Sequence, residues 1–190
     1  MIEAAAAFLA WLGCALIVLS DARRGLASGL AILTIGFAVL AAATGLPLGA
    51  AVVLAGGAIA SVLCWRWRPA GWGIMPPGST ARFVLCIAAG LLALWVAASV
   101  TTGGGAPLRF AVVLGLGLMA TRVLVAREIS VAMAAIAGLA LALGAAAGLA
   151  AGSPGPVPDA VGGLIAAGVL LVPRLGPTGQ PTPGPNHREA

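Results

Sequence analysis

The chain has 190 residues, of which 61% are hydrophobic and 8% are charged, with a mean hydropathy of +1.11. Soluble domains carry roughly 25% charged residues, so this composition offers too little polar surface to coat a water-soluble particle. The apolar residues form continuous runs, without the alternation that the strands of a membrane barrel require. The composition therefore predicts an all-α, polytopic membrane protein.

The charge balance indicates membrane topology rather than nucleic-acid binding. The net charge is +5 and every basic residue is an arginine. The arginines occur one or two at a time between apolar runs, so no basic stripe is available to follow a phosphate backbone. We therefore expect lipid, and no nucleic acid, as a partner.

Seven apolar runs follow one another along the chain. A helix that crosses about 30 Å of hydrocarbon needs about 20 residues. In chain order the runs cover residues 4–20, 26–44, 48–64, 83–100, 110–126, 129–151 and 161–172. The last is short and needs residues 160 and 173, or tilt of its neighbours, to reach across. About seven transmembrane helices are predicted.

The connecting segments carry charges and turn-forming residues. Gly45 and Pro47 separate the second run from the third, because glycine ends a helix and proline cannot continue one. The longest polar connection reads WRWRPAGWGIMPPGSTAR and the last reads SPGPVPDA. The final residues, 174–190, are rich in proline and glycine and are predicted to be a disordered tail. The division is a single transmembrane domain over 1–173 and a tail over 174–190.

The arginines predict the orientation. Nine of the ten fall on one side of the predicted membrane and Arg109 alone falls on the other. Arginine-rich short loops stay in the cytoplasm. We therefore expect the N-terminus outside and the C-terminal tail inside. The use of arginine without lysine is typical of GC-rich bacterial sequences, so the membrane is expected to be the inner (plasma) membrane of a bacterium.

Two segments of the sequence resemble each other. One begins at Leu12 with LGCALIVLSDARRGL and the other begins at Leu114 with LGLGLMATRVLVAREIS. Each continues through a second helix to a Pro-containing loop and a third helix. With one helix between them, the two units predict a parallel 3+1+3 repeat, an arrangement known in transporters.

Groups that carry chemistry are scarce in the predicted helices. A charge inside a membrane helix is the usual signal of a functional site. The five acids all fall in predicted termini or turns, and the one histidine, His187, falls in the tail. The three cysteines form no CxxC motif and are interpreted as packing residues. We therefore expect no enzyme activity, no cofactor and no metal.

Two polar positions inside the predicted spans stand out. Arg122 lies about one turn from the cytoplasmic boundary. Its long stem can carry the guanidinium to the headgroups, or the guanidinium can pair with an acid of another subunit. Thr34 lies in the middle of the second run. Its hydroxyl, like that of Thr121, is expected to bond back to its own helix.

Glycines spaced four apart predict close helix contacts. Gly144, Gly148 and Gly152 share one stripe of the sixth run, and Gly25 and Gly29 share another at the start of the second. Such stripes let helix backbones approach closely in membranes. They serve either packing within the chain or docking onto a neighbouring subunit.

The first three-helix unit, LGCALIVLSDARRGLASGL, resembles the K-type membrane subunit of the NADH-quinone oxidoreductase family. The whole chain resembles hydrogenase-4 component E over residues 8–175. The resemblance implies a subunit between larger antiporter-like subunits of a proton-translocating complex. The membrane-embedded glutamate of that family falls here at Thr34 and, in the second unit, near Ala137. A proton relay through this chain is therefore in doubt.

The function expected from the sequence is a non-catalytic integral membrane subunit of a larger, redox-linked proton-translocating complex, with other membrane subunits as partners. Two alternatives are a small seven-helix permease, with its path between the two triplets, and a membrane scaffold.

Overall fold

The structure is a computed structural model that describes residues 1–66, 79–100, 105–126, 128–150 and 156–175. Within these ranges the regular structure consists of seven α-helices and no strands, as the sequence predicts. They are α1 (Ile2–Leu19), α2 (Arg23–Ala43), α3 (Pro47–Trp65), α4 (Ser79–Val100), α5 (Ala106–Val125), α6 (Ile129–Ala150) and α7 (Pro156–Leu175).

Several helices are longer than the apolar runs that predicted them. α7 begins at Pro156, five residues before the run at 161–172, and includes Arg174 and Leu175 of the expected tail. Prolines fit there because the first backbone N–H groups of a helix have no intrahelical partner to lose. Part of the predicted last loop is therefore helical. Residues 176–190 lie outside the described residues.

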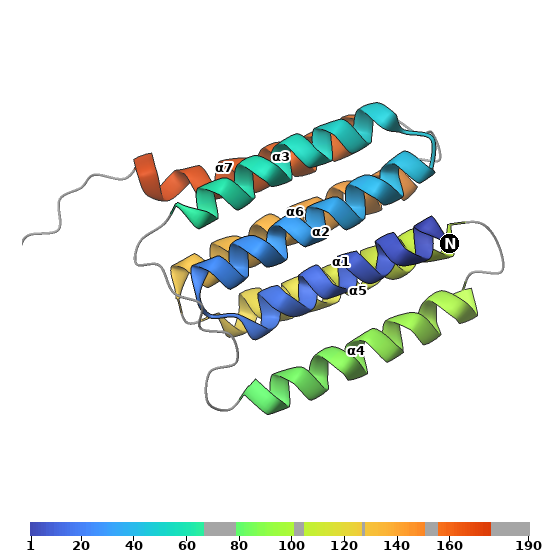
Figure 1. The fold of residues 1–190 in the computed structure, drawn as a ribbon, viewed down its shortest axis with the longest axis horizontal. Coiled ribbons are helices and arrows are strands. Elements are labelled where there is room, and N and C mark those ends of the chain that lie inside the picture. Colours follow the sequence, from blue (N-terminus) through green and yellow to red (C-terminus); the bar gives the residue numbers. More distant parts are fainter. Residues whose placement is uncertain (67–78, 101–104, 127, 151–155, 176–190) are drawn as a thin grey trace, which may run out of the picture.

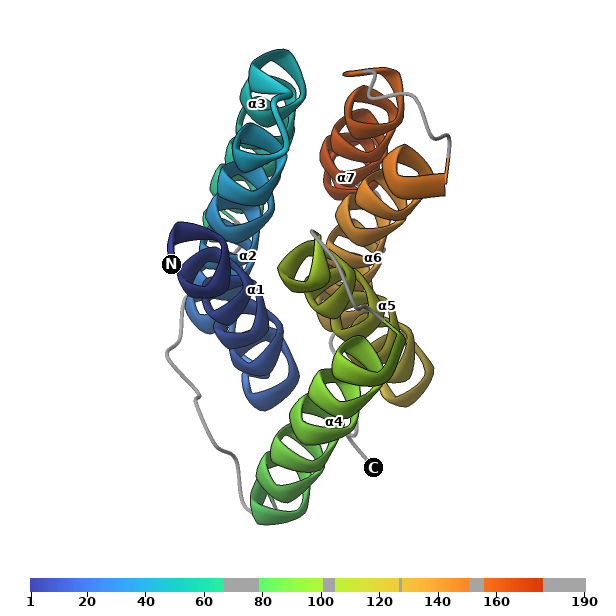
Figure 2. The ribbon, with the colours of Figure 1, turned by 90° about the vertical axis from the view of Figure 1, so that its right-hand side faces the viewer.

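The helices form two rows of three, with α4 beside them (Figures 1 and 2). One row is α1–α2–α3 and the other is α5–α6–α7, and neighbours in sequence are antiparallel neighbours within each row. Across the rows α1 packs on α5, α2 on α6 and α3 on α7. In the described part of the chain α4 packs only on α1 and α5. Helices α2 and α6 therefore occupy the middle of the bundle.

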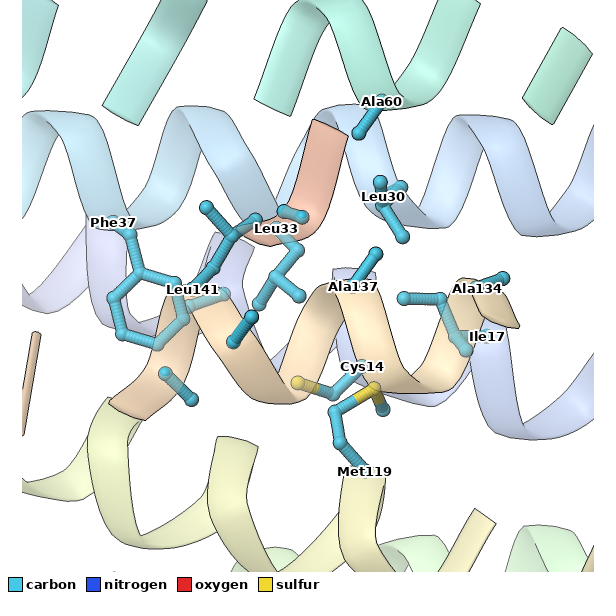
Figure 3. Packing of buried hydrophobic residues seen from close by; sticks show 14 of the residues in the cluster. Cys14, Ile17, Leu30, Leu33, Phe37, Ala60, Met119, Ala134, Ala137 and Leu141 are labelled. Atoms are coloured by element: carbon cyan, nitrogen blue, oxygen red, sulfur yellow. The ribbon is translucent and has the colours of Figure 1, made fainter. Parts of the chain in front are cut away.

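The hydrophobic core lies between the two rows (Figure 3). Four of its large side chains are 0% exposed: Ile17 of α1, Leu30 and Leu33 of α2, and Met119 of α5. Opposite them α6 presents small residues such as Ala137. Both rows contribute large and small side chains to this core, and the large ones of each row pack beside alanines of the other.

The outside of the bundle is apolar. Large hydrophobic side chains such as Leu91, Trp95 and Leu164 are 62–72% exposed. Among the residues that the structure describes, five helices are long and apolar enough to cross a membrane: α1, α2, α3, α5 and, over Ile129–Gly148, α6. The corresponding part of α7, Pro156–Leu171, is shorter. Exposed leucines over long apolar helices are typical of a multi-pass membrane protein, whose lipid-facing surface needs no polar coat.

Candidate functional site

Arg122, in the last turn of α5, is bound inside the protein. Its side chain is only 4% exposed. Its Nη2 atom donates a hydrogen bond to the carbonyl oxygen of Ser20 at 2.9 Å and forms an ion pair with Asp21 Oδ1. Neither expectation for this residue, headgroup contact or an acid of another subunit, foresaw this contact within the chain. The turn between α1 and α2 packs against the end of α5 and supplies the acid from 101 residues away.

The same contact closes the end of α1. Ser20 is the C-cap residue of that helix. The last carbonyls of a helix have no intrahelical donor and carry its negative dipole end, where a cation is favourable. Arg122 therefore joins the end of α1, the start of α2 and the end of α5. The Nη2 atom is thus held by groups of its own chain, whereas Nε is buried with no hydrogen-bond partner among the described residues.

The hydroxyl groups in the bundle bond to their own helices. Thr34 Oγ1 donates to the carbonyl oxygen of Leu30 at 2.7 Å, and Thr121 Oγ1 donates to that of Gly117 at 2.7 Å. The prediction of back-bonding is confirmed for both. Ser61, on α3, makes the same bond to the carbonyl oxygen of Gly57 at 2.7 Å. These three hydroxyl groups each donate their proton to a backbone carbonyl one turn earlier.

Thr34 is buried at a close contact between α2 and α3. Its side chain is 2% exposed. It packs on the backbone of Gly57, where an added Cβ would lie 2.7 Å from Thr34 Cβ. Gly57 therefore makes room for Thr34, and α2 and α3 approach closely at this position.

Asp159 is the acid whose place the sequence did not predict. It lies in the first turn of α7, not in a loop, and is 6% exposed. Its Oδ2 atom lies against Gly49 in the first turn of α3, 2.5 Å from where a Cβ at position 49 would be. A carboxylate is favoured at the N-terminal end of a helix, and here two such ends meet. The sequence features that could have indicated these two helix starts are Pro47 and Pro156, because proline is favoured at the first position of a helix.

The glycines of α2 form a tight seam with α1. Gly25 is buried at the start of α2. At Gly29 an added Cβ would lie 3.0 Å from the carbonyl oxygen of Gly13. The sequence missed two stronger contacts: a Cβ on Gly13 would lie 2.7 Å from Leu33 Cα, and one on Gly36 would lie 2.6 Å from the backbone nitrogen of Ala10. The seam therefore runs along both helices, beyond the GxxxG pair that indicated it.

The glycines of α6 do not share one contact. A Cβ on Gly144 would lie 2.9 Å from the carbonyl oxygen of Pro158, so this glycine packs on α7. Beside Gly148 there is open space, with no atom of the described residues within 4 Å of an added Cβ. Gly144 already meets the first turn of α7, so Gly148, one turn further on, lies beyond its start. Of the two uses expected for this stripe, packing within the chain is seen at Gly144 and not at Gly148. Gly152 lies outside the described residues.

A further glycine contact joins the rows. A Cβ on Gly56 of α3 would lie 2.6 Å from Gly163 Cα, and Gly162, its neighbour on α7, packs on Gly144. The adjacent pair Gly162-Gly163 thus lets α7 approach α3 on one side and α6 on the other. A search for glycines four apart passes over such a pair.

Comparison with family models, with curated proteins and with solved structures finds no match to this chain. The resemblance to the K-type subunit and to hydrogenase-4 component E thus depends on the sequence features that suggested it. Among the residues that the structure describes, no three His, Cys, Asp or Glu side chains gather as a metal-binding group.

Proposed function

We propose that this chain is a non-catalytic membrane subunit of a larger complex, redox-linked and proton-translocating. The observation that carries the proposal is how the bundle uses its buried polar groups. Thr34 and Ser61 bond to their own helices, and Arg122 bonds to the α1–α2 turn. These bonds support a structural role, because proton transfer needs groups that titrate or a wet, polar pore. Among the described residues the one buried carboxylate is that of Asp159, and it lies in the first turn of α7.

The open space beside Gly148 supports contact with another subunit. The glycine stripe of α6 continues past the start of α7, and nothing in the described part of the chain covers it at Gly148. A helix of a neighbouring subunit packs well on such a surface, because a glycine lets its backbone approach. The resemblance to K-type subunits suggests that antiporter-like subunits supply this helix.

The permease alternative requires a path between the two triplets. That space holds Ile17, Leu33, Met119 and other buried apolar side chains (Figure 3). A dry interface of this kind favours the subunit over the permease. The facing pairs of helices, α1 with α5, α2 with α6 and α3 with α7, do support the proposed 3+1+3 repeat. In this proposal the repeat builds a rigid body and carries no path.

We further propose that the N-terminus lies outside the inner membrane of a bacterium and the C-terminus in the cytoplasm. The described arginines support this orientation: Arg23, Arg24, Arg66 and Arg122 lie at one end of the bundle, and Arg109 lies at the other. Arg24 stacks on the ring of Trp65 at 5.7 Å. Tryptophan and arginine together are typical of the headgroup layer.

Purification from the native membrane in mild detergent tests the proposal. We expect a tagged chain to copurify with antiporter-like and redox subunits in fixed stoichiometry. Gly148→Leu fills the open space on α6 and is expected to reduce their recovery at least fivefold. Gly117→Leu, also beside open space but on α5, is the matched control and is expected to leave recovery unchanged. Recovery of the chain alone, at its monomer or homo-oligomer mass, would contradict the proposal.

A further inference from the structure

A large apolar groove lies at the outside of the bundle, where α4 meets the first row and the second. Its volume is about 610 Å³. Its walls come from α4 and from α1 and α5, the two helices on which α4 packs (Figure 2). The lining includes Ala4, Phe8 and Trp11 of α1, Leu91 of α4 and Pro107 of α5. The groove is thus built from three helices far apart in the sequence.

The chemistry of the lining fits hydrocarbon. The rings of Phe8 and Trp11 pack together with centroids 5.3 Å apart and form one wall. The one nitrogen among these side chains, Trp11 Nε1, is covered, because it lies over Gly90, 2.8 Å from where a Cβ there would be. The groove therefore presents carbon atoms to whatever occupies it.

The position of the groove favours an acyl chain as its occupant. It runs along the roughly 10 Å of α1 between Ala4 and Trp11 and opens onto the apolar outside of the bundle. That outside is the surface that faces acyl chains in a multi-pass membrane protein.

A cation lies at the end of the bundle where the groove begins. Ala106 and Pro107, which line it, are the first residues of α5, and Arg109 follows in the same turn and is exposed. In the first turn of a spanning helix, an arginine is at the depth of the headgroups, where a phosphate is its natural counterion. Arg109 lies beside the lining and not within it, and Glu3, in the first turn of α1 next to Ala4, adds a carboxylate at the same end. A lipid headgroup at this end therefore meets both charges, with its phosphate on Arg109 and its apolar part extending toward Trp11.

We infer that this groove binds one phospholipid, with its acyl chains between α1, α4 and α5 and its phosphate on Arg109. The lipid fills the space between α4 and the two rows and so holds α4 in place. This inference depends on the membrane setting of the bundle and is independent of the proposed role in a complex.

Native mass spectrometry of the full chain, purified in mild detergent from a membrane of known phospholipid composition, tests the inference. We expect a population that carries the mass of one phospholipid and keeps it when loosely held lipid is removed by detergent washing. Ala4→Trp fills the mouth of the groove and is expected to lower this occupancy at least fivefold. Ala5→Trp, on the exposed side of the next residue, is the matched control and is expected to keep the lipid.

Two further variants separate loss of binding from loss of folding. Leu91→Trp fills the groove from α4 and is expected to repeat the loss, with an unchanged size-exclusion profile. Arg109→Ala is expected to weaken retention, whereas Arg66→Ala at the other end of the bundle does not. Equal occupancy in the Ala4→Trp and Ala5→Trp variants would overturn the inference. So would an unlipidated wild-type chain, or a bound molecule whose mass shows no phosphate.

Discussion

Gly13→Ala is expected to destabilise the protein even though alanine is the better helix former. The added Cβ would lie 2.7 Å from Leu33 Cα and 2.8 Å from the carbonyl oxygen of Gly29, both of them backbone atoms that cannot rotate away. Carbon atoms pack at about 3.5–4.0 Å, so α1 and α2 must separate by about 1 Å. The dispersion attraction of one atom pair is about 0.1–0.2 kcal/mol, and such a gap removes a quarter to a half of it.

If roughly 40 atom pairs along the seam are affected, the loss is about 2 kcal/mol, within the usual range for overpacking. The higher helix propensity of alanine returns up to about 1 kcal/mol. We therefore expect a net loss of about 1–2 kcal/mol, which for a chain of this size lowers the melting temperature by about 2–8 °C. Thermal unfolding in detergent, followed by the monomer peak in size-exclusion chromatography, measures this shift.

Gly117→Ala is the matched control for Gly13→Ala. Gly117 lies inside α5 and has no atom within 4 Å of an added Cβ. Here only the helix propensity acts, so the melting temperature is expected to stay the same or rise. Gly36→Ala, on the α1–α2 seam, is expected to behave like Gly13→Ala. If both seam variants melt at or above the temperature of the Gly117→Ala variant, α1 and α2 do not pack as described.

Arg122→Met removes the donor to the Ser20 carbonyl and the cation beside Asp21, which is 37% exposed and so partly screened. We expect the free energy of unfolding to fall by about 1–3 kcal/mol. The double variant that also carries D21L is expected to regain part of this loss. Thermal unfolding checks this, and a single variant as stable as the wild type would refute it. In liposomes, we expect the purified protein to show no proton flux above that of empty vesicles; robust flux that a Thr34→Ala substitution abolishes would favour the permease. In a chain whose native cysteines have been replaced, we expect a cysteine at Gly104 to react with impermeant thiol reagents on intact cells and one at Gly78 to be protected. Labelling at Gly78 would contradict the proposed orientation.

The sequence by itself determined the class of the protein and its local hydrogen bonds. Long apolar runs between charged turns are enough to predict helices that suit a membrane, because the transfer free energy of each residue depends mainly on that residue. The back-bonds of Thr34 and Thr121 were predictable for a similar reason, since a hydroxyl in a helix always has a carbonyl one turn away. These features need no knowledge of how the helices pack.

The tertiary structure decided which residues meet across helices. It paired Arg122 with a turn 101 residues away, and it placed Gly13 and Gly163 in tight contacts while leaving Gly148 uncovered. A sequence of alanine, glycine and leucine offers small residues on nearly every face of each helix, so its pattern does not select one face. Rotation, crossing and relative height of the helices select it, and these depend on the packing of all seven together.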